Sequence, residues 1–299
     1  MKRLNLIGGL AGLLALGSCC SVQAAISCAT GDYNGTYAFF TTGYFLQLPP
    51  AAASLMGPFA QAGTFTSDGQ GNATIASTAS YNGLIQPANV PATYVLNPDC
   101  TITFSLTLPP PLSVPSTFQG VFSQDNGQLS LMITSPGGST VVGTHIKQYV
   151  QNCKLSTLNG AYAIDMEGST NGILSAAGAA ETGTFRRIGR VIADGAGNFT
   201  ATTLADYNGQ IVTENFNGTY TLGTNCVVSL IYTNGTNPSA QNAASRSGLL
   251  ARRGAGIHET AGGQTITISG PLASAGQSAM VMVATQGWAV SGTLKAVQH

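Results

Sequence analysis

The acidic residues with the most regular spacing lie in two copies of the motif Asp-Gly-x-Gly-Asn, at Asp68–Asn72 and Asp194–Asn198. Calcium binds roughly six to eight oxygen atoms, usually from several carboxylates, and each motif supplies one carboxylate. An Asp that accepts hydrogen bonds from the backbone just after it, beside glycines with positive φ, is typical of a hairpin turn. We favour the turn, so the sequence predicts neither a metal ion nor a cofactor.

The chain contains three histidines: His145, His258 and His299. His258-Glu259 does not extend to a zinc-binding His-Glu-x-x-His motif, because Gly262 occupies the last position. The serines include no Gly-x-Ser-x-Gly nucleophile elbow. His145 falls in an expected strand, and we expect it at the surface.

Two carboxylates, Asp165 and Glu167, share one face of an expected strand. A pair of carboxylates can hydrolyse glycosides. An isolated pair on a strand is more often a solvated face, which is the interpretation we favour. The sequence therefore predicts no catalytic residue, and a non-catalytic protein is favoured over an enzyme.

The charged residues are few and balanced, with 11 Lys and Arg against 11 Asp and Glu. A net charge of zero gives no basic surface for nucleic acid. Six arginines nevertheless concentrate in the second half of the chain: Arg186, Arg187, Arg190, Arg246, Arg252 and Arg253. They could form a patch for an anionic glycan, lipid headgroup or protein partner, although a solvated loop face is the interpretation we favour.

The N-terminus resembles an export signal. Lys2 and Arg3 precede an apolar run, and Val22-Gln23-Ala24 matches a signal-peptidase site, so residues 1–24 are predicted to be a signal peptide. Alternatively, Leu16–Cys19 resembles a lipobox that would place a lipid anchor on Cys19. Cleavage after Ala24 leaves four cysteines, whereas lipidation would leave Cys20 unpaired. A secreted or periplasmic location is favoured, and an outer-membrane lipoprotein stays open. No other segment reaches the roughly 20 apolar residues of a transmembrane helix.

The mature sequence repeats itself. Cys153 follows Cys28 by 125 residues, and Asn159-Gly160-Ala161-Tyr162 follows Asn34-Gly35-Thr36-Tyr37 at the same spacing. The Asp-Gly-x-Gly-Asn motifs, a Tyr-Asn-Gly motif and Cys100 with Cys226 recur at a spacing of 126. Further on the match loosens, and we align Gly127–Leu131 with Gly263–Thr267. We therefore predict two copies of one domain, at residues 25–150 and 151–299, with insertions late in the second copy.

The cysteines follow the repeat. The spans Cys28 to Cys100 and Cys153 to Cys226 are almost equal. Equal spans within repeated units predict one disulfide inside each domain. No Cys-x-x-Cys pair is present, which disfavours a structural zinc site.

Each copy has the pattern of a β-meander. In the first copy, Thr, Tyr, Val and Ile alternate between Gly and Asn turns, and eight strands are expected: 36–45, 59–67, 73–80, 92–97, 102–108, 117–123, 129–134 and 140–148. Such a meander hides its edges most simply by closing into a barrel. We expect an all-β protein of two tandem antiparallel meander barrels, and the segment Leu48–Ala53 could form a short helix or a lid over one mouth.

The order Asn-Gly-x-Tyr-Ala, Asp-Gly-x-Gly-Asn, then Gly-Thr-Tyr before a Cys resembles exported bacterial proteins of unknown function with lipocalin-like barrels, of the calycin or allene-oxide-cyclase-like kind. The resemblance implies the fold and no reaction. By analogy it implies a non-catalytic binding protein that holds a small apolar ligand. A structural or adhesive protein that contacts a surface partner through its loops is the alternative, and a barrel isomerase or hydrolase is the second alternative.

Overall fold

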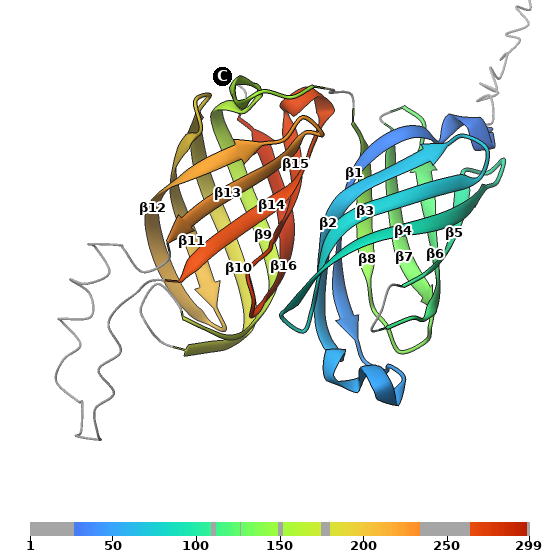
Figure 1. The fold of residues 1–299 in the computed structure, drawn as a ribbon, viewed down its shortest axis with the longest axis horizontal. Helices are drawn as coiled ribbons and strands as arrows, with labels where there is room; N and C mark the ends of the chain where they lie inside the picture. The colour runs from blue at the N-terminus through green and yellow to red at the C-terminus, as the bar shows by residue number, and fades with distance from the viewer. Residues whose placement is uncertain are drawn as a thin grey trace, which may run out of the picture.

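Two closed antiparallel barrels of eight strands each lie side by side in the computed structural model (Figure 1). The structure describes residues 27–108, 112–125, 127–148, 152–174, 180–233 and 264–297. In both barrels each strand pairs with the next along the chain, and the last strand pairs with the first. The predicted fold class, two tandem meander barrels with one disulfide each, is confirmed.

The first barrel consists of β1 (Asn34–Phe45), β2 (Gly57–Asp68), β3 (Asn72–Tyr81), β4 (Leu84–Leu96), β5 (Thr101–Thr107), β6 (Pro115–Ser123), β7 (Gln128–Ser135) and β8 (Val142–Lys147). The second consists of β9 (Asn159–Leu174), β10 (Ala180–Asp194), β11 (Asn198–Tyr207), β12 (Gln210–Leu222), β13 (Val227–Thr233), β14 (Thr265–Ala273), β15 (Ser278–Val283) and β16 (Trp288–Ala296). Four short 3-10 helices accompany them: η1 (Thr30–Asp32), η2 (Pro50–Leu55), η3 (Leu155–Thr157) and η4 (Ser274–Gly276).

All eight strands expected in the first copy are present, but β4 begins eight residues earlier than predicted, at Leu84 instead of Ala92. The earlier part contains Pro87 and Pro91, and proline cannot donate to a β-ladder. It is tolerated because residues 84–91 pair with β3 alone, whereas the ladder to β5 begins at Ala92.

Glycine allows the barrels to close. Gly43 in β1 and Gly168 in β9 have φ values of 153° and 154°, which residues with a side chain rarely adopt. A Cβ atom at Gly43 would collide with the backbone of Thr140, and one at Gly168 with the backbone of Ala289. Glycine at these positions lets the first strand of each barrel approach the last.

The Asp-Gly-x-Gly-Asn motifs form hairpin turns. Asp68 Oδ1 accepts hydrogen bonds from the backbone N–H groups of Gln70 and Asn72 at 2.7 and 3.0 Å. Its Oδ2 accepts one from the Asn72 side chain at 2.8 Å. Asp194 repeats this pattern in the β10–β11 turn. These hydrogen bonds lower the pKa of Asp68, and the one from the Asn72 side chain has the largest effect on it.

We expect Asp68→Ala and Asp194→Ala each to lower the Tm by a few degrees, because each removes the acceptor for three hydrogen bonds of a turn. Added calcium should leave the Tm of the wild-type protein unchanged, since one carboxylate per turn binds the ion weakly. Differential scanning calorimetry measures both effects. A calcium-dependent rise in Tm that disappears in the variants would show that the turns bind the ion.

Both predicted disulfides are present. Cys28 is bonded to Cys100 and Cys153 to Cys226, with Cα atoms 5.1 Å apart in each pair. Each bond joins the segment before the first strand of a barrel to the turn before the fifth strand. The N-terminal segment of each copy is thereby held against one end of its barrel.

Strand register relates the two barrels residue by residue and corrects one alignment. His145 pairs with Phe39 and with Leu129, and Leu294 pairs in the same way with Ile164 and Ala279. Strand β7 therefore corresponds to β15, and the predicted match of Gly127–Leu131 with Gly263–Thr267 is wrong. The second copy carries its extra residues between β13 and β14, where residues 234–263 lie outside the described part of the chain.

The barrels contact each other through β1 and β2 of the first and β14 to β16 of the second (Figure 1). Ala38 packs with Ala273 and Met280 in one buried cluster. Every residue of β15 is buried, because one face of this strand fills its own barrel and the other meets the neighbouring barrel. The Tyr44 hydroxyl lies 2.8 Å from the Ser169 hydroxyl across the interface. Within the described ranges, no helix is both long and apolar enough to cross a membrane.

Candidate ligand-binding site in the first barrel

The interior of the first barrel contains a cavity of about 40 Å³. The hydrophobic core of this barrel is divided into two clusters, one containing Phe39 and Phe104 and the other containing Phe45 and Phe59. Residues from both clusters line the cavity, which therefore lies between them. In the second barrel a single cluster runs through the whole core.

Side chains pack into both ends of the first barrel. At one end Tyr33, which follows η1, is fully buried and stacks on Tyr37 with ring centroids 4.3 Å apart. At the other end η2 buries Ala52 and Leu55 against the second cluster. The segment after β1 thus forms the short helix that the sequence suggested, and Figure 1 shows it below the barrel.

The wall of the cavity is mostly apolar. Aromatic and aliphatic side chains form most of it. Four lining residues carry polar groups: Thr41, Gln61, Tyr81 and His145. Gln61 is held in place, since its Oε1 accepts a hydrogen bond from Thr41 at 3.3 Å and its Nε2 donates to Ser77 at 2.7 Å. Gln61 and Ala88 are only half-buried although they face the interior, so the cavity leaves part of their surface accessible to water.

The structure corrects the expected position of His145. It is buried inside the barrel, not at the surface, with 4% of its area exposed. Its Nδ1 lies 2.7 Å from the Tyr33 hydroxyl. The prediction failed because His145 alternates with outward residues along β8, and strand pairing decides which set points inward. Burial lowers the pKa of His145 to about 3, so the imidazole is neutral at physiological pH.

Stability is therefore expected to fall as the pH is lowered from about 6.5. In the unfolded chain His145 binds a proton near its ordinary pKa of 6.5, whereas the folded protein takes it up only near 3. The free energy of unfolding should thus decrease by up to about 1.4 kcal/mol per pH unit between roughly pH 6 and 4.5. Urea unfolding at several pH values measures this slope. The variant Tyr33→Phe/His145→Phe should show a shallower slope, and an equal slope would contradict the assignment.

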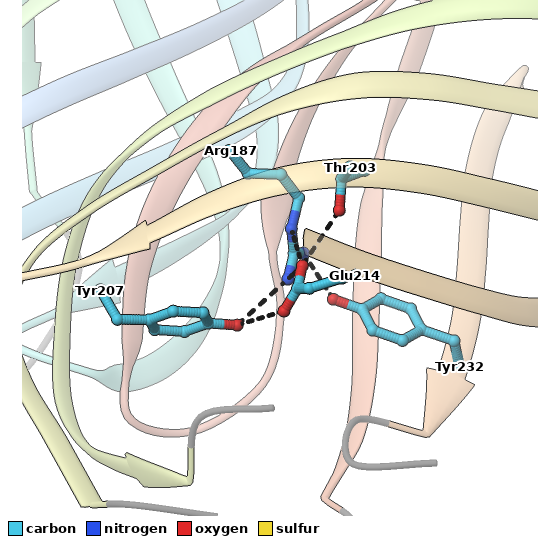
Figure 2. A network of polar contacts seen from close by, with 5 residues as sticks. All are labelled: Arg187, Thr203, Tyr207, Glu214 and Tyr232. Carbon is cyan, nitrogen blue, oxygen red and sulfur yellow. Dashed lines mark hydrogen bonds and ion pairs between the residues drawn. The ribbon is translucent and has the colours of Figure 1, made fainter. Parts of the chain in front are cut away.

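At the same level of the second barrel, charged residues fill the interior. Arg187 in β10 corresponds to Gln61, and Glu214 in β12 corresponds to Ala88. Figure 2 shows Arg187 and Glu214 between the hydroxyl groups of Tyr207 and Tyr232, with Thr203 beside them. The two barrels thus differ at this level: one holds a cavity and the other a buried ion pair.

The ion pair has nearby hydrogen-bond partners. Arg187 Nη2 lies 2.8 Å from Glu214 Oε2, and Arg187 Nη1 donates to the Tyr232 hydroxyl at 2.6 Å. Glu214 accepts further hydrogen bonds from Thr203 at 3.0 Å and Tyr207 at 2.7 Å. Burial alone would lower the pKa of Arg187, but Tyr232 and Glu214 outweigh it and raise the pKa. The group is therefore charged and satisfied, so we interpret it as structural.

The predicted arginine patch needs correction at Arg187, which lies inside the barrel and is fully buried. Arg186 is exposed and pairs with Asp165 at 3.1 Å and Glu167 at 3.4 Å. These two carboxylates share a solvated strand face, as the sequence indicated. Arg190 is exposed on the same strand, and an anionic partner for it stays a prediction.

Several predicted features lie outside the described residues: residues 1–24 with Cys19, the residues Arg246, Arg252 and Arg253, and the residues His258 and His299. Within the described ranges, no three His, Cys, Asp or Glu side chains gather in a group that could hold a metal ion.

Sequence reasoning missed Gln61, Tyr33, Glu214, Tyr207 and Tyr232. A usable signal exists for Glu214, because it stands in a strand at the position where the other copy has Ala88. A charged residue in one repeat, at the inward position where the other repeat has a small residue, indicates that one interior is filled and the other is not.

Comparisons with known proteins identify no relative by sequence: no protein-family model and no curated protein match this chain. Among solved structures, the chain is similar to the isotype 1 transferrin binding protein B from serogroup B Neisseria meningitidis, with 7% sequence identity and a TM-score of 0.34. The match covers 88% of this chain and 75% of that one.

Proposed function

We propose that the chain is an exported, non-catalytic binding protein whose first barrel holds a small, uncharged, mainly apolar ligand. The observation that carries this proposal is the cavity between two apolar clusters, at the level where the homologous barrel is filled by Arg187 and Glu214. No Asp, Glu, Lys or Arg is among the described residues that line the cavity. A charged ligand would therefore lose its hydration without gaining a counter-charge.

The size of the cavity limits the ligand. An engineered apolar cavity of about 150 Å³ binds benzene, and the cavity here is about 40 Å³. A molecule of a few non-hydrogen atoms is therefore the expected occupant. Very small ligands gain at most about 1.5 kcal/mol per non-hydrogen atom, so the dissociation constants of such molecules should lie in the high micromolar to millimolar range.

Filling the cavity should abolish binding. Isobutene, which has four non-hydrogen atoms, is a suitable apolar probe, and its binding is followed by NMR of methyl groups at Ile75 and Leu131, which line the cavity. Ala88→Leu adds three carbon atoms to the wall and is expected to weaken isobutene binding at least tenfold. The matched control is Asn89→Leu, which adds an apolar side chain at the exposed neighbouring position.

The proposal predicts that the wild-type protein and Asn89→Leu bind isobutene equally, while Ala88→Leu remains folded and does not. If isobutene causes no saturable shift at these methyl groups in the wild-type protein, or if Ala88→Leu binds it as well as the wild type, the proposal is wrong.

The second barrel suggests a different role for the other half of the chain. Its interior is filled by the ion pair and by Trp288, which is fully buried. A filled barrel is what a structural or adhesive protein requires, since its contacts are made on the outside. We propose that this barrel supports the first one and contacts any surface partner through its outer face. Export, by secretion or by a lipid anchor, is part of the proposal.

A further inference from the structure

His145 and Tyr33 form a buried polar pair beside the apolar cluster that contains Phe39 and Phe104. The Tyr33 hydroxyl and His145 Nδ1 are 2.7 Å apart. The Tyr33 hydroxyl can donate this hydrogen bond only if Nδ1 carries no proton. The opposite arrangement would leave the Tyr33 O–H without an acceptor, and a buried donor without a partner is costly. The arrangement with fewer unsatisfied groups therefore places the imidazole proton on Nε2.

Nothing in the described part of the chain accepts a hydrogen bond from Nε2. The ring lies among Phe39, Phe65 and Phe104, with centroid distances of 5.1, 5.1 and 6.0 Å. The two nitrogens point in different directions, so Nε2 faces away from Tyr33, and His145 is one of the residues that line the cavity. A polar side chain buried this deeply with an unused donor is a feature that a ligand can satisfy.

The second barrel shows that the pair is not needed to close the fold. The positions of Tyr33 and His145 are occupied there by Leu158 and Leu294. Leu158 and Leu294 are both fully buried in that core. Two leucines therefore close the corresponding end of the filled barrel, and the polar pair belongs only to the barrel with the cavity.

We infer that His145 presents its Nε2–H to the cavity as a hydrogen-bond donor, and that the ligand is a small neutral molecule with an acceptor oxygen, such as a ketone, aldehyde or ether. This inference rests on the proposed function of the cavity and specifies the class of ligand. The acceptor of the ligand contacts His145, while its apolar part lies against Ile75 and Leu131.

Two probes of nearly the same shape test the inference: acetone, which has an acceptor oxygen, and isobutene, which has a CH₂ group in its place. Binding of both is measured by NMR titration to the wild-type protein and to Tyr33→Phe/His145→Leu. Changing both partners removes the hydrogen bond without leaving half of it unsatisfied. Leucine stands at the corresponding position, Leu294, in the second barrel and has nearly the volume of histidine, so the cavity keeps its size. We expect the affinity ratio of acetone to isobutene to fall about five- to tenfold in the double variant, with isobutene affinity almost unchanged.

The outcomes separate the inference from the proposed function. If isobutene binds and the ratio is the same in both proteins, the inference is wrong and the proposed function stands. If neither probe enters the wild-type cavity, both are wrong. Long-range ¹H–¹⁵N NMR of the imidazole gives a second test without any ligand: a proton on Nε2 is expected, and a proton on Nδ1 would overturn the inference. Should the double variant fail to fold, His145→Leu alone provides the comparison, and the tautomer is still measured in the wild type.

Discussion

Replacing Glu214 by alanine is expected to lower the free energy of unfolding by about 3 to 5 kcal/mol, because it leaves the guanidinium of Arg187 buried without a counter-charge. Arg187 and Glu214 are almost completely buried and their charged groups lie 2.8 Å apart. The hydroxyl groups of Tyr207 and Tyr232 would remain near Arg187, but neither carries a charge at neutral pH, since burial raises the pKa of both. Chemical denaturation of the wild-type protein and the variant measures the loss.

Two control variants make this result specific to the buried pair. Glu167→Ala removes an exposed carboxylate of β9 that pairs at 3.4 Å with Arg186, the residue before Arg187 in β10. It should cost less than about 1 kcal/mol. Arg187→Gln/Glu214→Ala gives the second barrel the residues found at Gln61 and Ala88 in the first. This double variant should lose less stability than Glu214→Ala alone, since no unpaired charge remains. A larger loss in the double variant would contradict the interpretation.

Removing either disulfide is expected to lower the free energy of unfolding by about 4 kcal/mol, because each one closes a long loop in the unfolded chain. The sequence separations are 72 residues for Cys28–Cys100 and 73 for Cys153–Cys226. The variants Cys28→Ser/Cys100→Ser and Cys153→Ser/Cys226→Ser remove both cysteines of a bond, so no free thiol remains to form a wrong pair. Equilibrium unfolding under non-reducing conditions measures the effect.

The nearly equal spans give this prediction an internal comparison. The two variants should lose similar amounts of stability, since the entropy of loop closure depends on length. Peptide mapping of the oxidised protein should find a single cross-link within each copy. A main product that joins Cys28 to Cys153 or Cys100 to Cys226 would contradict both the pairing and the tandem arrangement.

The sequence determined the features that depend on local or repeated patterns. The Asp-Gly-x-Gly-Asn motifs predicted turns, because Asp accepts hydrogen bonds from the residues that follow it and the glycines adopt positive φ. The repeat predicted both disulfides and the number of barrels. In β4 the local signal misled, because Pro87 and Pro91 are tolerated only where a strand has a neighbour on one side.

The tertiary structure decided what each barrel contains. Closure brings together side chains from strands far apart in the chain, such as Tyr33 with His145 and Arg187 with Tyr232. Whether a residue points inward depends on strand register, and a shift of one residue exchanges the inner and outer sets. Composition cannot show whether the inward residues fill the space. Gln61 and Ala88 leave a cavity in the first barrel, whereas Arg187 and Glu214 fill the corresponding space in the second. The volume and pairing of the inward side chains are set only when the barrel closes.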